Sequence, residues 1–231
     1  MYEGSVPRPP DFAPRILGLD EAGRGSLVGP LVVGGFLGTE KSIRELFEVG
    51  VRDSKTLTAR RREELLGEIE RRGRCFVRKV YPNTIDDWVA RGRLNHLEAR
   101  EFGRVVRSAR PDRAYVDACD PVAHRFGQRV AQAARTSTAV IARHHADRDF
   151  PVVGAASIVA KVHRDRWIEQ LARRLGEPVG SGYPSDRRTT RLVQSVVERD
   201  RAFPSWVRRS WSTTERLKLT IVASRLEEFA R

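Results

Sequence analysis

The chain has 231 residues, with 43 Lys or Arg against 30 Asp or Glu, which gives a formal net charge of +13 at pH 7. Hydrophobic residues at 40% and charged residues at 32% are typical of a globular protein and exclude a fibrous or disordered chain. No apolar run approaches the roughly 20 residues of a membrane span, and the N-terminal MYEGSVPRPPDFAP lacks the apolar core of a signal peptide. We expect no membrane association. The positive charge favours a polyanionic partner.

The two cysteines indicate where the protein works. Cys75 and Cys119 are too few for a disulfide framework and too far apart for a zinc knuckle, so a cytoplasmic setting is expected.

Two buried strands joined by a glycine-rich turn are the first predicted elements. A Pro-rich extension, residues 1–14, precedes them. The apolar runs 16–19 and 31–36 predict the strands, and Gly23, Gly25, Gly29 and Pro30 lie between them. Glycines leave backbone amides bare of side chains, which suits the close approach of a phosphodiester.

Two carboxylates, Asp20 and Glu21, follow the first apolar run directly. Burying an unpaired carboxylate costs several kcal/mol, so such a pair needs a cation, hydrogen bonds or a protonated partner. Arg24 is one candidate cation and a metal ion is another. The alternative is a surface turn that happens to contain acidic residues.

Helices and strands then alternate along the chain. The pattern predicts a short amphipathic segment at 43–49, strands at 75–81, 114–116 and 139–141, and helices at 58–73, 84–91, 95–109, 121–134, 150–175, 189–199 and 213–230. We expect one α/β domain with a mixed sheet flanked by helices.

Further acidic, His and Trp residues need separate explanations. Asp117 ends an apolar strand, whereas Asp120 precedes Pro121 and is explained as a helix N-cap. His144 and His145, in the loop 144–149, could ligate a metal, but adjacent histidines rarely point into one site.

Two indoles stand among arginines in FPSWVRRSW. Trp206 and Trp211 could stack on bases in a nucleic-acid groove, but we expect them to pack on the core instead.

Six motifs, in the same order, carry a family resemblance over about residues 16–217: DEAGRG followed by GPLVV, DSK, the Asp after a strand, the HxAD loop, AASIVAKVHRD and GSGYPSD. The chain resembles ribonuclease HII, or type 2 ribonuclease H, especially its archaeal members. That resemblance implies the ribonuclease H-like form of the sheet, with a catalytic domain at 15–175 and a helical C-terminal region at 176–231 packed on it.

The family's four catalytic carboxylates map onto Asp20, Glu21, Asp117 and Asp147, with Asp149 as the most plausible wrong assignment for the last. Oxygen ligands of this kind select Mg²⁺ or Mn²⁺. The resemblance implies two-metal-ion hydrolysis of the RNA strand of RNA/DNA hybrids to a 5′-phosphate and a 3′-hydroxyl.

The resemblance also implies substrate contacts. Gly23, Arg24, Gly25 and Tyr183 resemble the family's device for reading an RNA–DNA junction, and Ser54 and Lys55 its phosphate contacts; Lys161 is a further expected contact. We therefore expect incision on the 5′ side of a single ribonucleotide embedded in duplex DNA, by a monomer.

Two departures from the family pattern stand out. Ser26 takes the place of an expected Pro after GRG, which relaxes the backbone restriction at that turn. The C-terminal SRLEEFAR lacks the glutamine and paired aromatics of the sliding-clamp tail found in some relatives, which puts clamp binding in doubt.

Two other classes fit part of the pattern. A non-catalytic nucleic-acid binder would use the acidic residues as caps and ion-pair partners, and a DNA junction resolvase would use four carboxylates on a similar sheet. Cleavage of an RNA/DNA hybrid, without cleavage of all-DNA junctions, distinguishes these classes.

Overall fold

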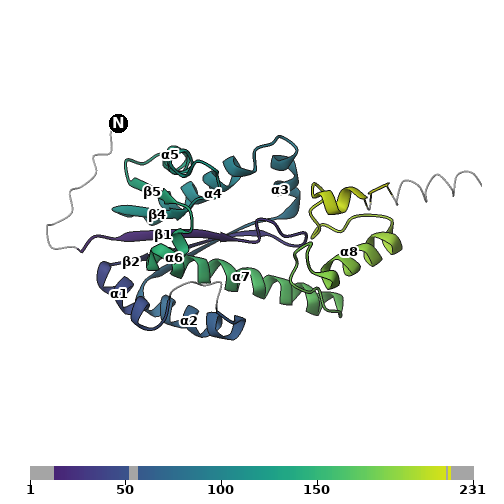
Figure 1. The fold of residues 1–231 in the computed structure, drawn as a ribbon, viewed down its shortest axis with the longest axis horizontal. Coiled ribbons are helices and arrows are strands. Elements are labelled where there is room, and N and C mark those ends of the chain that lie inside the picture. The colour runs from purple at the N-terminus through teal and green to yellow at the C-terminus, as the bar shows by residue number, and fades with distance from the viewer. Residues whose placement is uncertain (1–12, 52–56, 217, 220–231) are drawn as a thin grey trace, which may run out of the picture.

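A five-stranded mixed sheet forms the centre of the computed structural model, which describes residues 13–51, 57–216 and 218–219 (Figure 1). Its order is β3-β2-β1-β4-β5, with β1, β2 and β3 antiparallel and β4 and β5 parallel to β1. The strands are β1 Ile16–Ala22, β2 Leu31–Gly38, β3 Arg74–Val80, β4 Arg113–Asp117 and β5 Ala139–Arg143. The predicted α/β class with a mixed sheet is confirmed.

Helices cover both faces of the sheet (Figure 1). One face carries α1 Glu40–Glu48, α2 Ala59–Arg72 and α7 Pro151–Leu175, and the other carries α4 Leu94–Ala109 and α5 Ala123–Ala134. The remaining helices are α3 Pro82–Val89, α6 Ala146–Asp149 and α8 Arg187–Asp200. Within the described part of the chain, no helix has the length and apolar character needed to cross a bilayer.

Helix α2 begins and ends where its sequence signals predict. The Thr58 hydroxyl accepts a hydrogen bond from the backbone N–H of Arg61 at 3.2 Å, and Gly73 follows the last helical residue.

Two local predictions were wrong. Helix α5 begins at Ala123, two residues after the expected start, and Val122 is its N-cap. Asp120 instead accepts the backbone N–H of Val122 at 3.0 Å ahead of the helix. Residues 144–149, expected as a loop, contain the single turn of α6 because His145 adopts a left-handed conformation at its start.

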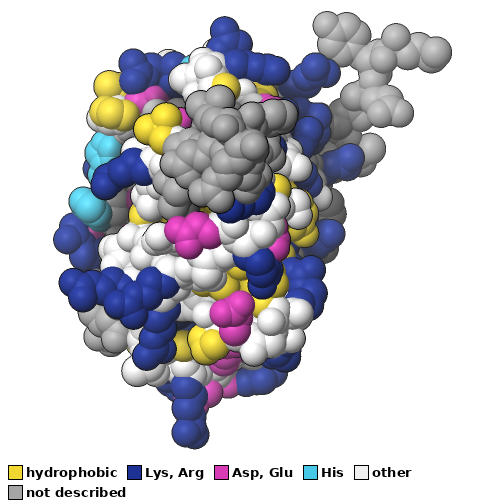
Figure 2. Space-filling view, turned by 90° about the vertical axis from the view of Figure 1, so that its right-hand side faces the viewer, with side chains coloured by type: hydrophobic (Ala, Val, Ile, Leu, Met, Phe, Trp, Pro, Cys, Tyr) yellow, Lys and Arg dark blue, Asp and Glu magenta, His cyan; other side chains and the backbone are white. Residues whose placement is uncertain are grey.

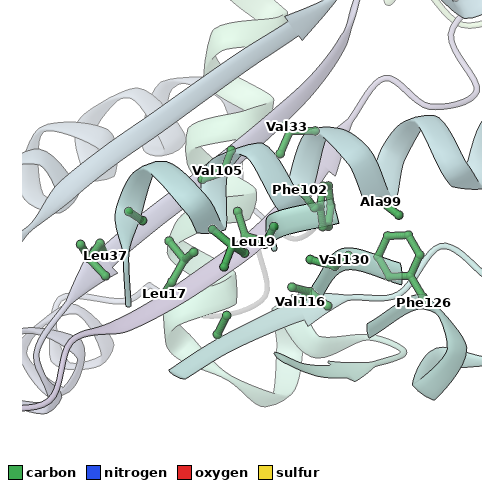
Figure 3. Close-up of a cluster of buried hydrophobic side chains, with 14 residues drawn as sticks. Leu17, Leu19, Val33, Leu37, Ala99, Phe102, Val105, Val116, Phe126 and Val130 are labelled. Atoms are coloured by element: carbon green, nitrogen blue, oxygen red, sulfur yellow. The ribbon is translucent and has the colours of Figure 1, made fainter. Parts of the chain in front are cut away.

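The core between the sheet and α4 and α5 consists of aliphatic and aromatic side chains (Figure 3). Leu17 and Leu19 of β1 meet Phe102 of α4, whose ring packs edge-on against Phe126 of α5 at 5.5 Å between centroids. Burying one such side chain contributes about 1.5–3 kcal/mol, so this layer fixes α4 and α5 on the sheet.

On the opposite face, α7 lies directly against the backbone of β1 and β2. A Cβ atom at Gly18 would collide with the carbonyl group of Val152, and one at Gly34 would meet the backbone nitrogen of Ala160 at 2.6 Å. These two glycines therefore allow the helix and the sheet to touch without intervening side chains.

The C-terminal region packs on one end of this assembly. Val193 and Val197 of α8 share a buried cluster with Leu27, Val28 and Trp167. Trp206 and Trp211 pack against the same cluster, which confirms the expected packing role. The domain boundary at residue 175 stays a prediction, and residues 1–12 of the expected extension lie outside the described residues.

Candidate active site

A cleft of about 500 Å³ opens where β1 and β4 end. Its lining brings together the predicted residues Asp20, Glu21, Asp117, Asp147, Gly23, Arg24, Gly25, Lys161 and Tyr183, and adds Ala22, Arg62, Arg164 and Asp165. Ser54 and Lys55 lie outside the described residues. The face at the α8 end of the molecule is bordered by many Lys and Arg side chains with few Asp and Glu among them (Figure 2).

Asp20 and Glu21 lie within β1, which continues to Ala22. Successive residues of a strand point to opposite faces, so Asp20 faces α7, where it hydrogen-bonds Ser157, and Glu21 lies near Glu98 of α4. Burial raises the pKa of Asp20 to about 7, opposed by nearby Lys161. Burial is the main reason that the pKa of Glu21 lies well above its usual range, and repulsion from Asp20 is the next largest cause.

The other two carboxylates come from β4 and α6. Asp117 is the last residue of β4, and its Oδ1 accepts the backbone N–H of Ala146 at 2.8 Å. That contact fixes α6 beside the end of β4 and places the buried Asp147 in the cleft.

Asp149 and the two adjacent histidines do not contribute to this lining. Asp149 and His144 line a separate hollow of about 750 Å³ beside β5, which includes none of the four predicted carboxylates. The Asp149 side chain is 47% exposed and pairs with Arg148.

The donor set of the cleft fits a hard divalent cation. All four predicted ligands are carboxylates, and Glu21 Oε2 is buried without a hydrogen-bond partner among the described residues. Burial and, after it, repulsion from neighbouring carboxylates raise the pKa values of Asp20 and Glu21, and a bound cation would offset both effects. Across the described ranges, no three His, Cys, Asp or Glu side chains already converge on one point as a complete metal site.

Arg24 does not neutralise the Asp20–Glu21 pair by a direct contact. Its Nε donates to Glu98 at 2.9 Å and its Nη2 donates to the side-chain oxygen of Asn95 at 2.7 Å. Glu98 is fully buried on α4 and also accepts from the Cys119 thiol at 2.7 Å. The Arg24 side chain is therefore held against α4 by this network, and the residue also lines the cleft.

Helix α7 contributes a polar edge that sequence analysis identified only in part. Lys161 Nζ donates to Ser157 Oγ at 2.5 Å. Asp165 accepts from Arg164 at 3.3 Å and from Arg62 of α2 at 3.0 Å. Lys161, Arg164 and Asp165 stand at i, i+3 and i+4 of one helix, and this spacing is the signal that could have grouped them.

Tyr183 lies on a turn that Arg164 stabilises. The guanidinium of Arg164 stacks 4.4 Å from the centre of the Tyr183 ring and donates to the backbone oxygen of Ser181. Nη2 of Arg164, which donates to Ser181, also donates to the hydroxyl of the buried Ser26 at 3.0 Å. The Gly182 carbonyl accepts the N–H of Leu27 at 2.8 Å, so the Tyr183 turn and the glycine-rich loop form one wall.

A mixed sheet of this order, with four carboxylates and several basic residues in one cleft, defines a nuclease of the ribonuclease H-like fold. The family model for Ribonuclease HII matches residues 17–214. Ribonuclease HII of Methanothrix thermoacetophila is 44% identical over 208 residues, which cover 90% of this chain and 99% of that protein.

Solved structures agree with this. The ribonuclease H2 from Pyrococcus horikoshii OT3 is 39% identical with a TM-score of 0.82, covering 90% of this chain and 99% of that one. RNase HII in the PCNA:RNase HII complex from Archaeoglobus fulgidus is 39% identical with a TM-score of 0.78, covering 88% and 96%. The chain belongs to the ribonuclease HII family, and it is an endonuclease for the RNA strand of RNA/DNA hybrids.

Proposed function

We propose that this enzyme cleaves by two-metal-ion phosphodiester hydrolysis and that it also incises DNA duplexes on the 5′ side of single embedded ribonucleotides. The observation that carries the first part is the cleft formed by Asp20, Glu21, Asp117 and Asp147, whose crowded negative charge favours bound Mg²⁺ or Mn²⁺. When bound, such ions activate water and stabilise the leaving oxygen, which yields 5′-phosphate and 3′-hydroxyl ends.

The chain's own residues would orient the scissile strand. Lys161 at one edge of the cleft attracts a phosphate and limits the charge repulsion felt by Asp20. Arg62 and Arg164 share Asp165, which keeps both guanidinium groups at the same edge. Basic residues beside an acidic metal-binding floor suit a polyanionic backbone.

Gly25 supports the second part of the proposal. A Cβ atom at Gly25 would meet no protein atom within 4 Å, so internal packing does not require glycine there. The residue lines the cleft, and the absence of a side chain leaves space for a ribose to approach the backbone. Tyr183 lies across the same cleft, with its ring oriented by Arg164 to stack on the neighbouring deoxyribose.

Substitution of these two residues tests the specificity. We expect Tyr183→Ala and Gly25→Ala each to lower cleavage of a duplex with one embedded ribonucleotide about tenfold or more. The first loses a stacking contact worth about 1–3 kcal/mol, and the second places a methyl group where the ribose approaches the backbone. Cleavage of a uniform RNA/DNA hybrid should fall less. Gly67→Ala on α2, where a Cβ atom has only ordinary contacts, is the matched control.

Two outcomes would contradict this assignment. A folded Tyr183→Ala variant with full single-ribonucleotide activity removes Tyr183 from the site. Wild-type protein that cuts the hybrid but ignores the embedded ribonucleotide removes the 5′-incision activity altogether.

The same proposal places a monomer in the cytoplasm. Cys75 and Cys119 are free thiols, which fits a reducing compartment. The Archaeoglobus fulgidus relative was solved with PCNA.

A further inference from the structure

Arg208 is a fully buried arginine that lies outside the cleft and contacts its wall from behind. It follows α8 in the C-terminal region, and its side chain donates to three backbone carbonyls of the glycine-rich loop. Nη2 donates to Gly23 at 2.6 Å, Nη1 to Arg24 at 2.7 Å and Nε to Gly29 at 3.1 Å. One guanidinium therefore ties together both ends of the loop that carries Gly25.

The backbone around Arg208 holds it in register with this loop. Its own N–H donates to Leu27 at 3.0 Å, the N–H of Gly29 donates to Trp206 at 2.9 Å, and Val28 forms an isolated antiparallel bridge with Val207. The Trp211 ring lies 4.9 Å from the guanidinium. The C-terminal segment thus runs alongside residues 27–29 and is hydrogen-bonded to them.

A buried cation at this place is costly to maintain. Burial lowers the pKa of Arg208 to about 9, and nearby Arg164 adds repulsion. Three hydrogen bonds to backbone carbonyls offset part of this cost, and an apolar residue in the same space would leave those carbonyls without these donors. The planar fork of arginine instead supplies geometry, since it can bind three differently placed carbonyl oxygens at once.

The direction of these carbonyls has a consequence for the cleft. In a trans peptide the C=O and the following N–H point in opposite directions. Because the carbonyls of Gly23 and Arg24 point at Arg208, the N–H groups of Arg24 and Gly25 point away from it, and both residues line the cleft. These are the two amides that we expect to donate to an oxygen of the substrate.

We infer that Arg208 is a positioning residue for ribonucleotide recognition: by holding the carbonyls of Gly23, Arg24 and Gly29, it sets the orientation in which the loop amides meet the substrate. This inference rests on the proposed role of the Gly23–Gly25 loop. Arg208 would be a second residue of the C-terminal region, after Tyr183, with a part in specificity, although that region supplies no carboxylate to the cleft.

Three variants test this role. Arg208→Lys keeps the charge but cannot reach three carbonyls, and Arg208→Met keeps much of the volume without any donor. Val207→Ala removes a buried side chain from the neighbouring position, so it weakens the apolar packing of the same region while leaving the three side-chain hydrogen bonds of Arg208 in place. For each variant, kcat and KM are measured on an embedded single ribonucleotide and on a uniform hybrid, together with thermal stability.

We expect both Arg208 variants to lose about 10- to 100-fold in kcat/KM on the embedded ribonucleotide, because small misplacements of binding groups carry penalties of this size. The loss on the hybrid should be smaller, and Arg208→Lys should recover part of the selectivity lost in Arg208→Met. Val207→Ala should lower stability while keeping the wild-type ratio between the two substrates. Arg208 variants that fold and keep this ratio overturn the inference.

Amide hydrogen exchange separates this inference from the proposed function. The exchange rates of the Arg24 and Gly25 amides should rise in Arg208→Lys but not in Val207→Ala, whatever the wild-type substrate preference. Unchanged rates in Arg208→Lys show that the loop does not depend on Arg208. If the wild type is inactive on the embedded ribonucleotide but exchange is faster in Arg208→Lys, the proposed specificity is wrong. Arg208 would still be the residue that orders the loop.

Discussion

Both the cleft and the region around α4 and the start of α5 contain buried carboxylates, but the charges that surround them are opposite. Asp120 is 1% exposed and accepts from Arg125 at 2.6 Å and Arg129 at 2.8 Å, so its pKa falls to about 2 despite burial. Glu101 pairs in the same way with arginines, and its pKa is lowered. Asp20 is nearly as buried, at 4%, yet its pKa rises to about 7.

Burial of a carboxylate therefore does not by itself mark a functional residue in this protein. Asp117 and Asp120 are three positions apart, and what distinguishes them is where the positive charge lies. Asp120 has two arginine partners, whereas Asp117 lies near Asp20 and Glu21 and adds to the repulsion on both. Burial and the neighbouring carboxylates raise the pKa values of Asp20 and Glu21 in the cleft, whereas arginine partners lower the pKa of Asp120.

The largest expected effect follows from removing charge on the cleft side of this comparison. Asp20→Asn and Asp117→Asn should each reduce hybrid cleavage by about 10³-fold, the equivalent of ~4 kcal/mol in transition-state stabilisation through bound cations. Hybrid binding should remain largely intact. Single-turnover cleavage at saturating Mg²⁺ measures this, and wild-type turnover by Asp117→Asn would show the two-metal assignment to be wrong.

The next effect concerns stability on the arginine-paired side. The pKa of Asp120 is depressed from 3.8 to about 2, so its ion pairs stabilise the fold above pH 3.8 and are lost as the pH falls through 2. Asp120→Asn should lower the free energy of unfolding by about 2 kcal/mol at pH 7, and this difference should shrink toward pH 2. Denaturant titrations at pH 7 and pH 3 measure it. An equal loss at both pH values would assign the effect to packing.

A smaller change in the free energy of unfolding, of opposite sign, is expected for a substitution in the cleft. Asp20→Asn removes one of several mutually repelling buried charges, so without divalent cations at pH 7 it should raise the free energy of unfolding by about 1 kcal/mol. Thermal unfolding in a chelator measures this, and added Mg²⁺ should stabilise the wild type more than the variant. Destabilisation by Asp20→Asn would mean that Lys161 and Ser157 already satisfy this carboxylate.

The smallest effect is on the salt dependence of binding. Lys161→Ala should weaken hybrid binding and flatten the slope of log K against log salt by about 1, as expected for one lost phosphate contact. Lys41→Ala on α1, whose side chain is 82% exposed, is the control and should leave the slope unchanged. Equal slopes for the two variants would mean that Lys161 makes no phosphate contact and that its role is the hydrogen bond to Ser157.

Sequence patterns predicted the sheet well but placed the end of its first strand too early. The apolar run stops at Leu19, while pairing continues through Asp20 with Gly34 to Ala22 with Val32. Backbone hydrogen bonding does not depend on whether the side chains are polar, so the pattern could not show that Asp20 and Glu21 belong to the strand.

Asp20, Glu21 and Asp117 were accessible to sequence reasoning because a charge that follows an apolar strand is conspicuous, whereas Asp147 was assigned only through the family resemblance. Arg164 and Arg208 were not, since an arginine in a sequence is normally read as a solvated surface residue. The burial of Arg208 depends on carbonyl partners as far away as Gly23, 185 positions earlier in the chain. Only the folded backbone reveals such partners.

The contact between α7 and the first two strands has a consequence for how the enzyme can change over time. Gly18 and Gly34 let the helix backbone rest on the sheet, so the distance from Asp20 to Ser157 and Lys161 does not depend on the size of intervening side chains. A side chain at either glycine would push α7 away from the strands, so these two positions have little freedom to vary as the sequence changes over time. Glu21 has no such protection, because it faces α4 and its position depends on the side chains of the opposite core.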